Sequence, residues 1–358
     1  MSAGPRRVVG EAADPAQLPD APTVAAIVPC LNEAGFMRGF LNQVFAMDYD
    51  PARFSVWVVD GMSTDGTRAI LLDYARREPR LHVLDNPGRT TAIALNIGLR
   101  ASRSDVVMRL DVHADYPTNY ASHLVSLLRT HRADNVGALR LTASGSTAWE
   151  NAFASLVSAP FAHGGAPWRA RPSRLLEVES VYCGCFPRSV FERVGAFDES
   201  MIRIEDREFN ARLRSRGGRI LLDPTLACTY HTRSKLGPYL RWTFSGPFRL
   251  FYSRRLTRTP LVRPRNYAPV LFVLYHLGLP VGAWMFGVVA FIPLVAYVAL
   301  ALIASGLEAR AHRRAAVLFL LPPLFYITHL VYGAGSLWGW LRALAPGVPP
   351  QPEGRFEH

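Results

Sequence analysis

The feature that most constrains the fold is a stretch of 41 residues without a charged side chain, which lies between Asn266 and Glu308. A helix needs about 20 apolar residues to cross a membrane, so this stretch is long enough for two helices. We expect them to form a hairpin that turns near residues 278–282. A third apolar run, Ala315 to Trp340, contains two consecutive prolines. It is either a third span or a re-entrant or interfacial segment.

Basic residues flank the uncharged stretch on both sides. Residues 224–266 contain nine Lys and Arg and no Asp or Glu, and three arginines follow Glu308 closely. The positive-inside rule places both flanks on the cytoplasmic face. We therefore expect a multi-pass protein of the cytoplasmic (inner) membrane whose preceding folded part faces the cytoplasm. Because most of the net charge of +12 belongs to one segment, a nucleic-acid-binding domain is not expected.

The chain divides into five predicted segments. Residues 1–22 lack the continuous apolar core of a signal peptide and are expected to be a disordered tail. Residues 23–245 form a folded domain, and residues 267–341 a membrane region of about three spans before a tail at 342–358. Between them, residues 246–266 interleave Arg with aromatic residues, which suits the lipid headgroup layer, although an ordinary solvated helix is the alternative.

Two residues at the start of this interfacial segment predict a helix boundary. Ser245 is expected to cap a short helix that has Pro247 in its first turn. The four cysteines show no CxxC pair and no spacing typical of a disulfide framework, so we expect reduced thiols.

The folded domain alternates strand and helix patterns. Short apolar runs end in polar loops, and helical stretches separate them; the expected strands are 23–29, 55–60, 81–86 and 105–111, and the expected helices 34–46, 67–77 and 91–101. This order predicts an α/β fold with a doubly wound sheet and ligand loops at the carboxyl ends of the strands. No GxGxxG and no GxxxxGK[ST] motif occurs, which argues against a dinucleotide dehydrogenase and a P-loop NTPase.

Polar side chains follow these strands. Asp60 ends one strand and is placed to accept hydrogen bonds from a nucleobase or ribose, whereas Asp65 is expected to have a structural role at the next helix. Asp111 and His113 follow another strand two residues apart, so in an extended chain both face one ion. An imidazole beside a carboxylate accommodates Mn²⁺ as well as Mg²⁺.

Two further candidates lie later in the chain. Glu205 and Asp206 open a helix that Gly217 and Gly218 close; the pair acts either as helix caps or, for Asp206, as a general base. His231 follows a strand pattern and is either a third metal ligand or a buried structural histidine.

Taken together, these motifs resemble the inverting family 2 glycosyltransferases of the GT-A fold. The resemblance covers residues 24–245 in five blocks, IVPCLNEAGF, VVDGMSTDGT, NPGRTTAIALNIGL, LDVHADYP and GCFPRSVFERVGAFDESMIRIEDREF. It is closest to the succinoglycan-type exopolysaccharide glucosyltransferases, which also carry DxH and hydrophobic C-terminal spans. The fold that it implies is a doubly wound mixed sheet followed by C-terminal transmembrane helices.

The resemblance also implies roles for single residues. Asp206 is the expected catalytic base, and Asp111 and His113 the expected ligands of a divalent metal, Mn²⁺ or Mg²⁺. Glu205, Arg241 and Trp242 are expected on the acceptor side. Contacts with the nucleotide sugar are expected from Pro29, Asn32, Glu33, Asp60, Arg89, Asn96 and Asp111. The glutamine of the QxxRW motif is missing before Arg241, which counts against processive synthesis.

The expected function is transfer of a sugar, with inversion, from a UDP-linked hexose to a lipid-linked saccharide in exopolysaccharide or cell-envelope glycan synthesis. The expected partners are the nucleotide sugar, the lipid-linked acceptor and membrane lipids. One alternative is a polyprenyl-phosphate sugar synthase, whose phosphate acceptor needs little deprotonation. The other is an inactive assembly scaffold.

Overall fold

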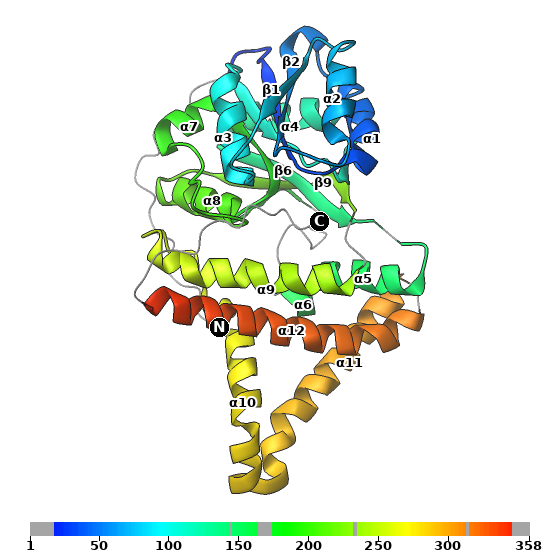
Figure 1. The fold of residues 1–358 in the computed structure, drawn as a ribbon, viewed down its shortest axis with the longest axis vertical. Helices are drawn as coiled ribbons and strands as arrows, with labels where there is room; N and C mark the ends of the chain where they lie inside the picture. The colour runs from blue at the N-terminus through cyan, green and yellow to red at the C-terminus, as the bar shows by residue number, and fades with distance from the viewer. Residues whose placement is uncertain (1–17, 144, 164–173, 232–234, 313–314, 346–358) are drawn as a thin grey trace.

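A computed structural model describes residues 18–143, 145–163, 174–231, 235–312 and 315–345. Most of the predicted tails at 1–22 and 342–358 therefore lies outside the described residues. Figure 1 shows an α/β part stacked on a base of long helices, from which a helical hairpin projects.

The α/β part is built on one mixed sheet of nine strands. The strand order is β3-β2-β1-β4-β8-β6-β9-β5, and β7 pairs with β9. β1, β2, β3 and β4 pair in parallel, whereas β8 pairs antiparallel with both β4 and β6. The strands are β1 (Val24–Cys30), β2 (Phe54–Asp60), β3 (Leu81–Asp85), β4 (Val106–Arg109), β5 (Ala114–Asp115), β6 (Asn135–Thr142), β7 (Leu176–Glu177), β8 (Tyr182–Pro187) and β9 (Ile220–Tyr230).

Helices cover both faces of the sheet because its central strands are apolar on both sides. In β1, Val24, Ala26 and Val28 face one hydrophobic cluster and Ile27 faces the other. One face is covered by α1 (Ala34–Phe45), α2 (Thr67–Ala75) and α4 (Tyr120–His131), and the other by α3 (Thr91–Ala101), α7 (Arg188–Val194) and α8 (Glu205–Ser215). The predicted α/β fold and its first four strands are confirmed, each strand to within two residues.

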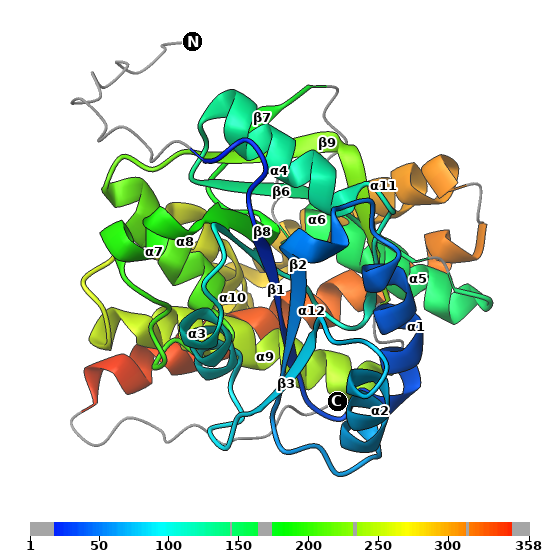
Figure 2. The same ribbon diagram turned by 90° about the horizontal axis from the view of Figure 1, so that it is seen from above.

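The base consists of two long helices that lie side by side beneath the sheet (Figure 2), α9 (Leu236–Tyr252) and α12 (Ala315–Leu344). Small residues permit this contact, because a Cβ at Gly335 would lie 2.3 Å from the Phe244 carbonyl oxygen and one at Gly339 would lie 2.2 Å from that of Phe248. The short helices α5 (Ala148–Ser158) and α6 (Pro160–His163) pack on α12.

The hairpin consists of α10 (Ala268–Phe286), the 3-10 turn η5 (Gly287–Phe291) and α11 (Ile292–His312). Two helical stretches are long and apolar enough to cross a membrane, Pro264–Ala311 and Ala316–Leu344. α12 lies across the upper end of the hairpin rather than alongside it (Figure 1), which favours the interfacial alternative for the third apolar run. The remaining 3-10 helices are η1 (Pro51–Arg53), η3 (Ser253–Arg255) and η4 (Pro264–Tyr267).

Two local predictions in this region are wrong, the helix start at Ser245 and the position of the hairpin turn. α9 passes through Ser245 without a break and contains Pro247 in its interior, so no short helix starts there. The predicted domain boundary at 245/246 therefore falls inside one helix. The hairpin turns at residues 287–291 instead of 278–282, because α10 continues to Phe286 and the positive φ of Gly287 (57°) then ends it.

Candidate active site

The loops after β1 and β2 are joined by side-chain hydrogen bonds. The Asn32 backbone N–H donates to the Ser63 hydroxyl at 2.8 Å, and the Thr64 N–H donates to the Asn32 side-chain oxygen at 2.9 Å. Asn32 has a left-handed φ of 56°, which asparagine tolerates well. The two strand ends therefore present one continuous rim, with Pro29 inside β1 and Asn32 on the rim itself.

Asp60 lies under this rim at the end of β2 and is 1% exposed. Its Oδ1 accepts hydrogen bonds from the Ser63 N–H (3.1 Å) and hydroxyl (2.6 Å), and its Oδ2 lies 3.6 Å from the Arg68 guanidinium. The predicted structural role of Asp65 is confirmed, because its carboxylate accepts from Thr67 in α2 and from the backbone N–H of Ala34 in α1.

The loop after β4 is a turn rather than the extended chain expected at Asp111 and His113. The Tyr116 hydroxyl holds this turn, because it accepts from the Asp111 N–H at 2.8 Å and donates to the Asp111 carbonyl at 3.2 Å. The His113 ring lies between two partners, with Nδ1 3.2 Å from Glu33 Oε1 and Nε2 3.1 Å from the Tyr230 hydroxyl. Glu33 thereby links the loop after β1 to the turn.

Arg109 is the functional residue that sequence reasoning missed. It ends β4, and its side chain is 13% exposed. Its Nε donates to Asp111 Oδ1 at 3.1 Å, and its terminal nitrogen donates to Glu205 Oε1 at 3.2 Å and Asp206 Oδ2 at 2.5 Å. One guanidinium thus holds together the turn after β4 and the start of α8. The only sequence signal was a basic residue two positions before Asp111.

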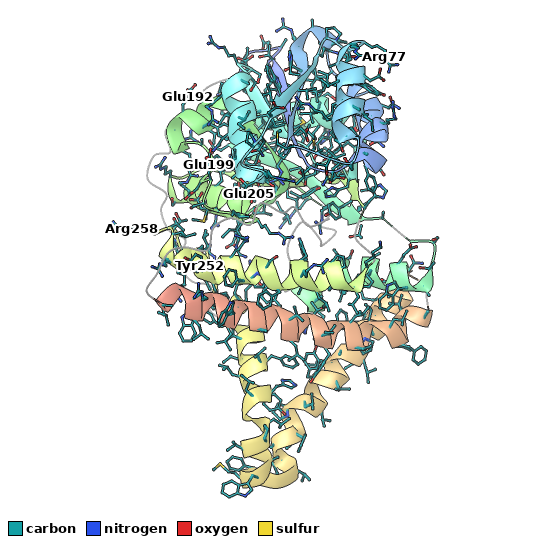
Figure 3. All side chains as sticks on the ribbon, in the orientation of Figure 1. Arg77, Glu192, Glu199, Glu205, Tyr252 and Arg258 are labelled. Atoms are coloured by element: carbon teal, nitrogen blue, oxygen red, sulfur yellow. The ribbon has the colours of Figure 1, made fainter. Side chains whose placement is uncertain are left out.

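Glu205 and Asp206 occupy the first turn of α8, where the helix dipole favours negative charge. Figure 3 places Glu205 on the side of the α/β part that faces the base helices. Burial raises the pKa of Glu205 to about 7, and the charge of Asp206 adds to this effect. Burial would also raise the pKa of Asp111, but the Arg109 charge lowers it below its usual value. Asp111 is therefore anionic at neutral pH, while Glu205 holds its proton unusually strongly.

Comparison with known proteins places this geometry in a family. The family description "Glycosyl transferase family 2" matches residues 25–182. The succinoglycan biosynthesis protein ExoA of Rhizobium meliloti (strain 1021) is 30% identical over 271 residues, which cover 72% of this chain and 81% of that protein. The chain belongs to glycosyltransferase family 2.

This family 2 glycosyltransferase is also similar to two further proteins. Dolichyl N-acetyl-alpha-D-glucosaminyl phosphate 3-beta-D-2,3-diacetamido-2,3-dideoxy-beta-D-glucuronosyltransferase of Methanococcus voltae is 24% identical over 231 residues, covering 62% of this chain and 71% of that one. The structure of the mannosyltransferase PcManGT of Pyrobaculum calidifontis, in complex with GDP-Man and Mn²⁺, aligns with a TM-score of 0.54 and 22% identity over 94% of this chain and 91% of that one. The fold is the GT-A fold.

The side chains of the turn after β4 fit a divalent metal that is also coordinated by the phosphates of a nucleotide. Asp111 and His113 offer a carboxylate and an imidazole, whereas no group of three His, Cys, Asp or Glu side chains suited to a metal occurs within the described ranges. His231, predicted as a third metal ligand or a structural histidine, pairs through its Nε2 with Asp115 Oδ2 at 2.7 Å. A cation that a diphosphate chelates needs only one or two protein ligands. Asp111 and His113 together provide two such groups.

Two more residues of this glycosyltransferase were predicted to contact the nucleotide, Arg89 and Asn96. The Arg89 backbone N–H bonds to Asn86, while its buried Nε lacks a hydrogen-bond partner in the part of the chain that is described. Asn96 is buried, and its amide bonds to the backbone of Phe197 and to Glu199, at 2.9 to 3.0 Å. These contacts connect α3 to the loop after α7, and the nucleotide contact of Asn96 stays a prediction.

The predicted acceptor-side pair Arg241 and Trp242 lies on α9. Trp242 is exposed, and its ring stacks near Tyr239 at 6.3 Å between centroids. Arg203, two residues before Glu205, donates to the Ser245 hydroxyl of α9. The structure thus places the base helices directly beside the start of α8.

Proposed function

We propose that the chain is a membrane-anchored, inverting glycosyltransferase that moves a hexose from a UDP-sugar to a lipid-linked saccharide. The observation that carries the proposal is the Arg109 bridge. It brings Asp111 and Asp206, 95 positions apart in the chain, to one guanidinium. Donor chemistry and acceptor chemistry need such neighbouring carboxylates, because the attacking hydroxyl must meet the anomeric carbon.

The donor half consists of the rim after β1 and β2 and the turn after β4. Asp60 accepts hydrogen bonds from the nucleoside, at the strand end where its carboxylate already accepts two hydrogen bonds from Ser63. Arg89 offers a buried N–H without a partner among the described residues, and a guanidinium of this kind pairs well with phosphate oxygens. Asn32 and Glu33 shape the rim on the other side.

Asp206 removes the proton from the acceptor hydroxyl. Arg109 orients this carboxylate. Burial raises the pKa of Asp206, and the positive charge of Arg109 opposes this increase. The Asp206 side chain is 32% exposed, so an acceptor can reach it. A divalent cation held by Asp111 and His113 would neutralise charge on the departing diphosphate.

The base and the hairpin anchor the enzyme and present its acceptor. Both ends of the hairpin lie at the base (Figure 1), and arginines occur at both ends, which supports a cytoplasmic position for the α/β part. The names of the two relatives support the acceptor class, since one belongs to succinoglycan biosynthesis and the other acts on a dolichyl-linked sugar phosphate.

The test is transfer of labelled sugar from a panel of UDP-sugars into the lipid-extractable fraction of membranes that contain the protein. Mn²⁺, Mg²⁺ and EDTA are compared, with native-host lipid extract as the acceptor source. We expect label that depends on metal and that Asp206→Asn abolishes. Label that survives Asp206→Asn would favour a polyprenyl-phosphate sugar synthase, and UDP binding without transfer in the presence of host lipid would favour a scaffold.

A further inference from the structure

A cluster of arginines outside the carboxylate site surrounds one carboxylate, Glu179. Arg263 lies 3.2 Å from Glu179 Oε1, Arg265 lies 3.3 Å from Oε2, and Arg214 lies 3.8 Å from Oε1. These arginines come from the loop before α10, from η4 and from α8. All four side chains are partly exposed, with 34 to 57% of their surface accessible. Solvent or a ligand therefore reaches the cluster.

A fourth arginine lies at the inner side of this cluster. Arg207 is half-buried and donates to the Asn266 side-chain oxygen at 3.2 Å. Burial lowers the pKa of Arg207, and the charges of Arg265 and Arg263 lower it further. Three guanidiniums thus lie within 3.8 Å of a single carboxylate, with Arg207 beside them, and one negative charge does not balance these four positive charges. An anionic ligand would supply the missing negative charge.

The position of the cluster identifies the kind of anion. Arg265 belongs to η4, which leads directly into α10, so the cluster lies where the α/β part meets the membrane hairpin. Arg207 follows Asp206 immediately on α8. We propose that Arg207, Arg214, Arg263 and Arg265 bind the phosphate or diphosphate group of the lipid-linked acceptor. This inference rests on the proposed function and names the acceptor's binding site.

Guanidinium chemistry suits this ligand. Arginine pairs with phosphate oxygens through two parallel N–H donors, and it does so at a membrane surface without losing its charge. Glu179 accepts from the same donors and therefore competes with the phosphate.

The proposal also limits the length of the acceptor saccharide. Asp206 and Arg207 are consecutive residues of one helix, and a helix with its side chains is only about 12 Å across. The hydroxyl that Asp206 activates and the phosphate that Arg207 holds must therefore lie close together. The acceptor is a short saccharide whose reactive sugar lies near the lipid phosphate.

Binding by the full chain in neutral detergent micelles tests the site. The probes are undecaprenyl diphosphate, inorganic diphosphate and phosphatidylglycerol. The variants are Arg263→Gln with Arg265→Gln, and Glu179→Gln. The matched control is Arg76→Gln with Arg77→Gln, two exposed residues, of which Figure 3 shows Arg77 at the end of the α/β part that lies away from the base helices. Melting temperature checks the fold of each variant.

We expect the wild type to prefer undecaprenyl diphosphate over both other probes. Each basic side chain near a lipid phosphate contributes roughly fivefold, so the double Arg variant should bind this lipid about 25-fold more weakly, and the control should bind it as the wild type does. Glu179→Gln should bind it more tightly, because the competing carboxylate is gone. A purely structural ion-pair cluster predicts no gain in that variant, and this result would overturn the proposal.

Two other results also count against the site. Equal affinity for phosphatidylglycerol would assign the cluster to general membrane contact, and equal affinity for inorganic diphosphate would assign it to a soluble anion. The transfer assay separates failure of this inference from failure of the proposed function. An unchanged KM for the lipid acceptor in the double Arg variant overturns only the inference, whereas wild-type protein that binds the lipid but transfers no sugar overturns only the function.

Discussion

Replacing Arg109 with methionine tests the bridge between the two halves of the site. Arg109 contacts Asp111, Glu205 and Asp206, and its side chain is 13% exposed. Removing one partner of a buried ion pair costs about 3–5 kcal/mol, because the other charges stay buried and uncompensated. At about 2 °C per kcal/mol for a chain of this size, the melting temperature should fall by about 6–10 °C.

The same substitution should change catalysis in a way that a packing defect does not. Loss of the orienting contact misplaces the base, and a displacement of about 1 Å costs about 100-fold in rate. Because Arg109 lowers the pKa of Asp206, its removal should also move the acidic limb of the pH–rate profile to higher pH. The assay is labelled-sugar transfer across a pH series, with the melting temperature measured in parallel.

Arg188 provides the matched control. Its guanidinium is also partly buried but donates to the backbone oxygens of Ser104 and Leu99 and to the Ser102 hydroxyl, away from the carboxylates. Arg188→Met should lower the melting temperature without moving the pH–rate profile. If Arg109→Met and Arg188→Met give the same pH–rate profile, Arg109 does not position the base and the reasoning is refuted.

Three more predictions address other parts of the structure. Asp60→Asn should weaken UDP binding about tenfold or more by calorimetry, because hydrogen bonds to a charged group contribute about 1.5–3 kcal/mol; unchanged affinity would remove Asp60 from the nucleotide site. Gly335→Ala should destabilise the protein by about 1–3 kcal/mol, since its Cβ meets the Phe244 carbonyl oxygen, whereas Gly278→Ala, which meets nothing within 4 Å, should not; equal melting temperatures would contradict the close helix contact. Glu205 keeps its proton to higher pH when folded, so wild-type stability should fall as the pH rises from about 4.5 through about 7, and Glu205→Gln should show a smaller decline in melting temperature over that range.

The sequence predicted the α/β part well because its signals are local. Buried parallel strands such as β1 and β2 appear as continuous apolar runs that end in a polar residue, and this pattern places their ends to within a residue or two. Asp65 was assigned correctly for a similar reason, since an Asp just before a helix commonly bonds to its first turn.

The rest depended on contacts between distant segments. Arg109 and Glu205 meet across 96 positions, and no pattern in a single sequence predicts such a pair. The turn at Asp111 is held by the Tyr116 hydroxyl, which bonds to both the N–H and the carbonyl of Asp111. Asp111 and His113 therefore do not lie in the extended chain that the sequence predicted.

The C-terminal helices show the limit of glycine and proline as signals in a sequence. Pro247 was expected in the first turn of a new helix and Gly278 at the turn of the hairpin, but Pro247 lies within α9 and Gly278 within α10. Gly287 ends α10 through its positive φ. Whether a glycine or proline ends a helix can be decided only when the segments packed against that helix are known.

The central claim is that Asp206 activates an acceptor hydroxyl for sugar transfer. The most direct measurement is labelled-sugar transfer from UDP-sugars to host lipid, comparing wild type with Asp206→Asn at equal protein and with UDP affinity measured for both. The account predicts a rate loss of at least about 100-fold with UDP binding retained. Transfer at the wild-type rate by Asp206→Asn would contradict it.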